Sequence, residues 1–227
     1  MDENKSLSES MQETIEYGNL EFLDDIGEIM IDATLNDGLL QDVPVIRTIV
    51  GVGRCIRNVY DALFAKKLIS FLIPIKDVSP KIRAKAIRKW QEDDDYRGKV
   101  GETLLGMIQR CDDAVKAKWL SKLFYELVLK RGWSRLFMRA EKTLSSLSVM
   151  DVQAFLNMKE SHIYHIKESE SEPFIGSGLY QNPQIESSRE EKIDLSDKYC
   201  EPTEIGILIY NVLNNIPMTT VEQNTLF

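Results

Sequence analysis

The residues that could do chemistry are few and widely spaced in this chain of 227 residues. Its two histidines, His162 and His165, could place both rings on one side, but two ligands with no third histidine or cysteine nearby do not define a zinc site. The three cysteines, Cys55, Cys111 and Cys200, lie far apart and indicate neither a disulfide framework nor a zinc pattern, which favours a reducing compartment. No serine or cysteine has an evident histidine partner or a nucleophile-elbow motif, so we expect a protein that is not an enzyme.

Two further patterns could bind a phosphate or a metal ion, and each has a simpler structural explanation. Gly51 and Gly53 resemble part of a dinucleotide-binding loop, but the third glycine and the preceding strand are missing. One predicted helix face carries four acids without the Glu-x-x-His motif that accompanies metal-binding acids in helical bundles. These acids are Glu21, Asp25, Glu28 and Asp32. The three acids at 93–95 suit the positive end of a helix better than a magnesium site. We therefore predict no metal ion and no cofactor.

Charge is distributed unevenly along the chain, whose net charge is −8. Residues 1–43 carry one lysine against twelve acids, residues 44–142 carry 22 basic residues against 11 acids, and residues 143–227 carry five against thirteen. This layout indicates either a basic surface for an external anion or pairing between segments. The candidates for a basic face that binds a partner or an anion are Lys81, Lys85, Arg88, Lys89, Arg97, Arg135 and Arg139. Anionic lipid or nucleic acid could occupy such a face, although the acidity of the whole chain weakens the nucleic-acid case.

The elements that must position these residues are mostly helices. The composition, 43% hydrophobic and 28% charged, is typical of a globular protein. Residues 1–18 are acidic, and we expect them to be flexible. Ser79 and Pro80 predict a helix start, with Ile82 and Trp90 facing inward. Apolar residues at helical spacing predict helices over residues 19–36, 80–91, 100–111, 115–128 and 133–147.

The segment 45–73 is apolar over most of its helical circumference. It is therefore either the buried centre of a bundle or a membrane-seeking element, and Gly51 and Gly53 could split it. The residues that would form its membrane-facing or groove-lining surface are Ile49, Val52, Ile56, Leu63, Phe64, Leu68 and Phe71. No stretch of 18 residues lacks charge and no apolar run follows the N-terminus, so we expect neither a conventional transmembrane helix nor a signal peptide. A cytoplasmic location follows, with membrane association as an alternative.

The last third of the chain changes character. Ser148 predicts the start of a short helix ending near Met158, residues 167–197 have the composition of loops, a brief strand is expected at 199–200, and Thr203 predicts a final helix. Leu147-Ser-Val-Met-Asp-Val-Gln-Ala-Phe-Leu156 and the run from Thr203 through Gly206 to Leu213 resemble helices of winged-helix domains. The whole layout is similar to that of Abi-alpha-like proteins, a bacterial group associated with phage defence. The expected recognition helix is replaced by acidic, serine-rich sequence, so the resemblance implies a protein-contact module rather than a DNA reader.

These observations predict an all-α fold, a multi-helix bundle with a small winged-helix-like C-terminal module. The expected parts are a flexible N-terminus at 1–18, a bundle at 19–147, the module at 148–216 with its loop at 167–197, and a tail at 217–227. The expected function is a non-enzymatic protein-interaction or regulatory role, which the resemblance places in phage–bacterium conflict. The alternatives are a conditional membrane-acting protein that uses residues 45–73 and a nucleic-acid binder that uses the basic middle segment.

Overall fold

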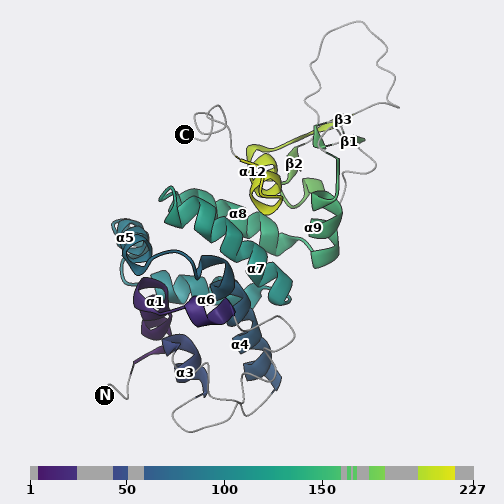
Figure 1. Cartoon of the computed structure of the whole chain (residues 1–227). Helices are drawn as coiled ribbons and strands as arrows, with labels where there is room; N and C mark the ends of the chain where they lie inside the picture. Colours follow the sequence, from purple (N-terminus) through teal and green to yellow (C-terminus); the bar gives the residue numbers. More distant parts are fainter. Residues whose placement is uncertain are drawn as a thin grey trace, which may run out of the picture. The chain divides into compact units, whose positions relative to one another are not determined.

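The computed structural model describes residues 5–24, 43–50, 59–159, 163–164, 166–167, 174–181 and 199–217. These residues are mostly helical and include a small three-stranded sheet, which confirms the helical fold class (Figure 1). The chain divides into two compact units, Met1–Met138 and Arg139–Phe227, and each is described by itself. The boundary between them falls inside one helix.

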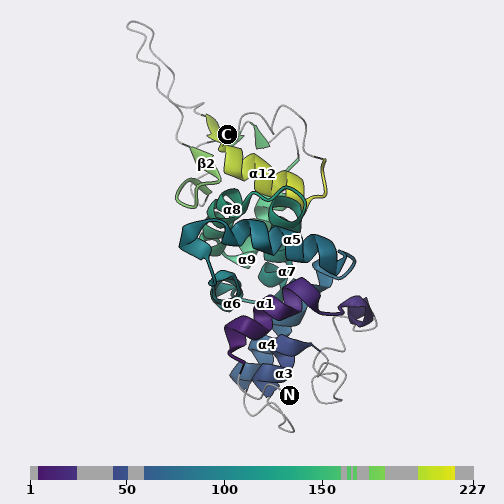
Figure 2. The same ribbon diagram turned by 90° about the vertical axis from the view of Figure 1, so that its left-hand side faces the viewer.

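Unit 1 is a bundle of helices in which α1 has a central place. Its elements are α1 (Leu7–Tyr17), α3 (Pro44–Val50), α4 (Val59–Leu72), α5 (Pro80–Gln91), α6 (Val100–Arg110), α7 (Ala114–Leu123), the π-helical segment η5 (Phe124–Leu129) and the start of α8 (Ser134–Ser146). Helix α1 packs against α3, α5 and α6, while α4 packs against α7. Figure 2 shows α1 and α6 side by side, as in Figure 1.

An aromatic cluster forms the core of unit 1. Phe71, Trp90, Phe124 and Phe137 are all at most 2% exposed. The ring centroids lie 5.5 Å apart for Phe71 and Phe124, 5.6 Å for Phe124 and Phe137, and 5.8 Å for Trp90 and Phe137. Each such pair contributes about 0.5–1.5 kcal/mol beyond the burial of its area. The cluster joins α4, α5, η5 and the start of α8, so it ties together elements that are far apart in the sequence.

The expectation of a flexible N-terminus is wrong for residues 7–17, which form α1. Ser6 and Glu9 make a capping box, in which the Glu9 N–H donates to Ser6 Oγ at 3.2 Å and the Ser6 N–H donates to Glu9 Oε2 at 2.8 Å. Met11 and Ile15 are 0% exposed, so the helix is anchored in the core. The Ser-x-x-Glu signal was present in the sequence, and two apolar residues four apart marked the buried face.

The helix predicted over 19–36 does not begin at Asn19. Residues Glu21–Asp24 form a 3-10 turn, and the Asn19 side chain accepts a hydrogen bond from the Glu21 N–H at 3.2 Å, which competes with helical hydrogen bonding. Residues 25–42 lie outside the described part of the chain. Of the predicted helix 45–73, the structure describes α3 and α4, and residues 51–58 with both glycines lie outside it.

Helix α5 begins at Pro80 as predicted, but the inward orientation expected for Ile82 is wrong. Ile82 is 51% exposed, and the neighbouring Arg83 is buried at 2% exposure instead. The Arg83 guanidinium donates to the carbonyl oxygens of Gly18 at 2.7 Å and Thr14 at 3.3 Å. These carbonyls lie at the C-terminal end of α1, where the negative end of the helix dipole favours a cation. Burial lowers the pKa of Arg83.

Unit 2 combines helices with the small sheet. It contains the rest of α8, then α9 (Val149–Leu156), β1 (Ile166–Lys167), β2 (Tyr180–Gln181), β3 (Tyr199–Pro202) and α12 (Glu204–Leu213). The antiparallel strands have the order β1-β3-β2. The predictions of a strand at 199–200 and of helix starts at Ser148 and Thr203 are confirmed.

The core of unit 2 is also aromatic. The Phe155 ring lies 5.8 Å from Tyr210, 5.9 Å from Phe174 and 6.1 Å from Tyr180, measured between centroids. The buried hydroxyl of Tyr180 donates to the Ile163 carbonyl at 2.9 Å, so its polar end is satisfied. This core therefore packs α9, α12 and β2 against one another.

Candidate functional site

Four of the predicted basic residues form an exposed face on α5. Lys81, Lys85, Arg88 and Lys89 are all exposed. Among the described residues, none of these four cations has an acidic side chain within ion-pair distance. Their charge is therefore available to an external anion.

Two other predicted residues are paired within unit 1. Arg97 lies 2.7 Å from Asp94, and Arg135 lies 3.1 Å from Asp93. Asp93 therefore caps the 3-10 turn Asp94–Tyr96, and Asp93 and Asp94 pair with arginines. The acids at 93–95 do not start α6, which begins at Val100. Because both arginines are exposed, each pair contributes only about 0–1 kcal/mol. Arg97 and Arg135 nevertheless offer less free charge than the four cations of α5.

Glu126 forms ion pairs with two further cations that follow η5. Lys130 Nζ lies 2.9 Å from Glu126 Oε2, and Arg131 pairs with the other carboxylate oxygen. Burial opposes ionisation of Glu126, but the hydrogen bonds from Lys130 and Arg131 outweigh it and hold the pKa of Glu126 below its usual value. Hydrogen bonding to Glu126 correspondingly raises the pKa of Lys130. Each of these two cations has an acidic partner, although one carboxylate serves both and the cluster keeps a net charge of +1.

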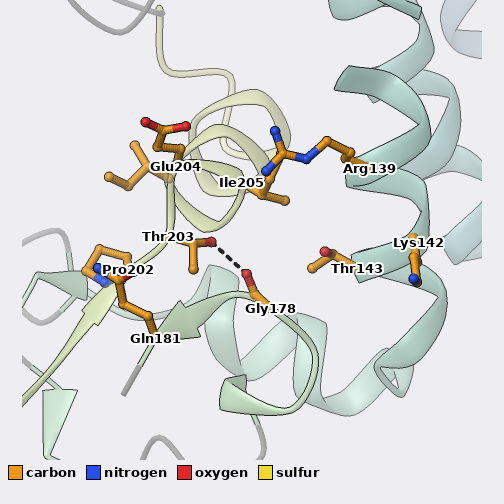
Figure 3. Close-up of a pocket in the computed structure, with 10 residues that line it drawn as sticks. Arg139, Lys142, Thr143, Gly178, Gln181, Pro202, Thr203, Glu204 and Ile205 are labelled. Atoms are coloured by element: carbon orange, nitrogen blue, oxygen red, sulfur yellow. Dashed lines mark hydrogen bonds between the residues drawn. The ribbon is translucent and has the colours of Figure 1, made fainter. Parts of the chain in front are cut away.

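The remaining predicted basic residue, Arg139, lines a hollow within unit 2. The hollow has a volume of about 670 Å³. Three parts of unit 2 meet around it: the second half of α8, the turn before β2, and the point where β3 leads into α12 (Figure 3). Its polar lining includes Arg139, Lys142, Thr143, Gln181, Thr203 and Glu204.

Short-range hydrogen bonds hold the turn before β2 against the start of α12. Thr203 is the N-cap, and its hydroxyl accepts from the Gly206 N–H at 3.0 Å and donates to the Gly178 carbonyl at 2.6 Å. Gly178 has a φ of +89°, a conformation that other residues rarely adopt. A Cβ at Gly206 would lie 2.2 Å from the Leu179 carbonyl oxygen, so glycine allows the turn to approach α12 closely. The wall of the hollow is therefore built by local sequence chemistry.

Several hydrogen-bond donors face this hollow without a partner in the described part of the chain. Thr143 is 8% exposed, its hydroxyl makes no hydrogen bond to any described residue, and Figure 3 shows its side chain directed from α8 toward Gly178. Arg139 and Lys142 are exposed and have no described acidic partner. The N–H groups of Glu204 and Ile205 begin α12, where the first amides of a helix have no intrahelical partner. Together these groups suit a small anion.

The residues predicted for a membrane or groove surface are divided between core and surface. Leu68 and Phe71 are 0% exposed, Phe64 and Ile49 are half-buried, and Leu63 is 51% exposed. Val52 and Ile56 lie outside the described residues. Tyr60, one turn before Leu63 on the same helix, is 83% exposed. Within the described residues, no helix has the length and apolar character needed to cross a membrane.

The other chemical candidates are not brought together in the described structure. His162 and His165 lie outside the described residues, as do Asp25, Glu28 and Asp32 of the acidic set. In the described ranges, no group of three or more histidine, cysteine or acidic side chains is placed to hold a metal ion. Comparison with known proteins found no matching family model, curated protein or solved structure.

Sequence reasoning found Arg139 but missed the residues that accompany it in the hollow. Lys142 and Thr143 follow on the same helix, one turn later, and their sequence context is ordinary. Thr203 was recognised as the start of the last helix, yet nothing in the sequence placed it beside α8. Only the packing of unit 2 joins the two segments.

Proposed function

We propose that this chain is a cytoplasmic, non-enzymatic interaction protein whose hollow in unit 2 binds an acidic group of a partner protein. The observation that carries the proposal is the pair of cations, Arg139 and Lys142, which have no described acidic partner, beside the Thr143 hydroxyl, to which no described residue bonds. An acidic group in the hollow would accept charge-assisted hydrogen bonds from the two cations and a further hydrogen bond from the hydroxyl.

The apolar part of the lining supports a protein ligand. Pro202, Ile205 and Ile207 line the same hollow as the cations. Protein-binding sites commonly combine apolar contact area with a small number of polar groups that fix orientation. A partner segment with an acidic group beside an apolar side chain would satisfy both parts of this lining.

We also propose that unit 2 is a winged-helix-like module and that the chain is Abi-alpha-like. The antiparallel order β1-β3-β2, followed directly by α12, supports this assignment, as does the resemblance of residues 147–156 and 203–213 to winged-helix sequences. A role in phage–bacterium conflict follows from that resemblance. In this proposal the module contacts protein, because acidic residues occupy the sequence where DNA contacts would be expected.

Nucleic-acid binding through α5 is a second candidate, favoured by its four exposed cations without described acidic partners. It requires affinity that falls steeply with salt concentration, because phosphate contacts release counterions. A membrane-acting role through residues 45–73 has less support. Inserting this face would withdraw Leu68 and Phe71 from the core, at about 1.5–3 kcal/mol for each side chain.

Site-specific photo-crosslinking tests the leading proposal. A photoreactive amino acid in place of Gln181, which lines the same hollow, should give one discrete adduct in cells, whereas the same group at Gln153, an exposed position on α9, should not. The crosslinked protein, once purified, should bind the wild-type chain and lose binding to the double variant Arg139→Glu, Lys142→Glu.

The matched control reverses the same number of charges on α5, in Lys85→Glu, Lys89→Glu, and should leave partner binding unchanged. Equal loss of binding in both double variants would refute the proposal, because it would mean that net charge rather than the hollow determines association. Loss only in the α5 variant, together with a steep salt dependence, would favour the second candidate.

A further inference from the structure

The donors that line the hollow come from two helices. Arg139, Lys142 and Thr143 belong to α8, and the first backbone N–H groups belong to α12. Helix α12 has ten residues, so its N-terminus carries a developed positive dipole end. The Thr143 hydroxyl is an independent pointer to a ligand, because its residue is 92% buried, it faces the hollow and no described residue bonds to it (Figure 3).

A phosphoryl group matches this arrangement better than a carboxylate. A phosphorylated side chain carries close to two negative charges and three terminal oxygens, which can accept from donors on several sides at once. A carboxylate has two oxygens in one plane and one negative charge. Cations on one wall and helix amides on another therefore suit a tetrahedral dianion.

The surroundings favour one compact anion on a peptide. The carboxylate of Glu204 lies at the rim, turned away from Thr143 in Figure 3, and would repel the regular phosphates of nucleic acid or an anionic membrane. The chain as a whole has a net charge of −8, which acts in the same direction. Pro202, Ile205 and Ile207 offer apolar contacts to neighbouring peptide side chains.

We propose that the hollow between α8 and the N-terminus of α12 in unit 2 recognises a phosphorylated serine or threonine of a partner protein. This inference rests on the proposed function and names the chemical class of its ligand. Arg139 and Lys142 neutralise the phosphate charge, the Thr143 hydroxyl donates to one oxygen, and the Glu204 and Ile205 N–H groups donate to the others.

The first test is a titration of the full chain with inorganic phosphate at constant ionic strength, with chloride as the reference anion, followed by amide chemical shifts. The amides of residues 204–206 and Gly178 should move with a common dissociation constant. Arg139→Gln, Lys142→Gln should weaken binding about tenfold or more, because charge-assisted hydrogen bonds are lost. The matched variant Lys85→Gln, Lys89→Gln, on α5, should leave the dissociation constant unchanged.

Two single substitutions separate recognition from general damage to the fold. Thr143→Val keeps the shape of the side chain and should weaken binding about two- to tenfold, while Thr143→Ser should retain it. Glu204→Gln should tighten binding about twofold, since it removes a like charge from the rim. A structural defect would weaken binding in each case, so an increase in affinity for Glu204→Gln is specific to the proposed site.

The second test uses a blocked glycine–phosphoserine–glycine peptide and its serine counterpart. The phosphopeptide should bind at least about tenfold more tightly, and tighter than vesicles of phosphatidylserine or a single-stranded oligonucleotide measured at the same salt concentration. Shifts spread evenly over all basic faces, equal binding of the two peptides, or stronger binding of vesicle or oligonucleotide would each overturn the inference. If the peptides bind equally while the crosslink from position 181 persists, the interaction proposal stands and the phosphate assignment fails.

Discussion

The close approach of Gly206 to the turn before β2 gives a prediction whose size follows from the structure. In Gly206→Ala the new Cβ would start 2.2 Å from the Leu179 carbonyl oxygen, and an ordinary contact of 3.4 Å requires a shift of about 1.2 Å. The same oxygen accepts the Thr203 N–H at 2.8 Å, so the shift also weakens the attachment of the α12 cap. Overpacking costs about 1–3 kcal/mol and a lost hydrogen bond about 0.5–1.5 kcal/mol, while the better helix propensity of alanine returns at most about 1 kcal/mol. We expect a net loss of about 1–3 kcal/mol in unit 2.

The assay is native-state hydrogen exchange of the α12 amides, which reports the free energy of opening for unit 2. The loss should accelerate exchange of these amides by about five- to 150-fold, since 1.4 kcal/mol is a factor of ten. The matched control is Gly106→Ala in α6, where the new Cβ meets only Arg110 Nη1 at 3.5 Å. That substitution should stabilise unit 1 by about 0.5–1 kcal/mol and slow exchange in α6.

The two alanine substitutions are chemically identical and have opposite expected signs. If Gly206→Ala left α12 exchange unchanged or slowed it, the close packing of α12 on the turn would not exist in solution. The wall of the hollow would then be wrongly placed, and the ligand proposals would lose their geometric basis.

Three further expectations concern the cap, a buried phenol and α4. Thr203→Ala should destabilise unit 2 by about 1–2 kcal/mol in urea unfolding, because the Gly206 N–H and the Gly178 carbonyl both lose their partner, whereas Thr203→Ser should retain most of the stability. Burial, with smaller contributions from Cys200 and Tyr210, raises the pKa of Tyr180 to about 12, so an ultraviolet titration should show one late-ionising tyrosine. The folded state then holds that proton more tightly than the unfolded chain, and stability that is complete below pH 10 should fall as the pH rises to 12, by at most about 2–3 kcal/mol. In α4, Phe71→Ser should lower the free energy of unfolding by about 3 kcal/mol or more, whereas Leu63→Ser should lower it by under about 1 kcal/mol. Because the apolar face of α4 is used in the core, the wild-type chain should not float with anionic or neutral liposomes.

Each of these expectations has a distinct contrary result. Equal stability losses for Thr203→Ala and Thr203→Ser would show that the cap hydroxyl is not used. A Tyr180→Phe variant with the same loss of stability at high pH as wild type would assign that loss to another group. Flotation of the folded chain would mean that the apolar face of α4 leaves the core, which contradicts the burial of Leu68 and Phe71.

The start signals of most helices could be read from the sequence because they depend on hydrogen bonds within three or four residues. Ser148, Thr203 and Asp113 each accept from backbone N–H groups in the turn that they begin, and Pro80 has the preset φ of a first helical residue. The same kind of signal, Ser6 with Glu9, marked α1, and it was overlooked because an acidic, polar composition suggested a loose end. Local chemistry thus accounts for where these helices begin.

Periodicity failed where a long-range partner overrode it. Helical spacing placed Ile82 inside, yet Arg83 occupies the inward position. Its guanidinium donates hydrogen bonds to carbonyls at the C-terminal end of α1, which lie 65 and 69 residues earlier in the chain. Arg83 can occupy the core because both of its terminal guanidinium nitrogens find carbonyl acceptors, and no local pattern reveals those acceptors. Charge patterning likewise showed a basic middle segment, but it could not separate the unpaired cations of α5 from Arg97 and Arg135, which are paired.

What the sequence determined by itself was the helical fold class, the caps and most of the apolar faces, because these depend on neighbours along the chain. Tertiary structure alone decided the hollow, since Arg139, Gly178 and Thr203 belong to three segments that only folding brings together. The physical reason is that a binding site consists of groups whose own partners are missing, and a missing partner can be recognised only after the packing of all the other groups is known.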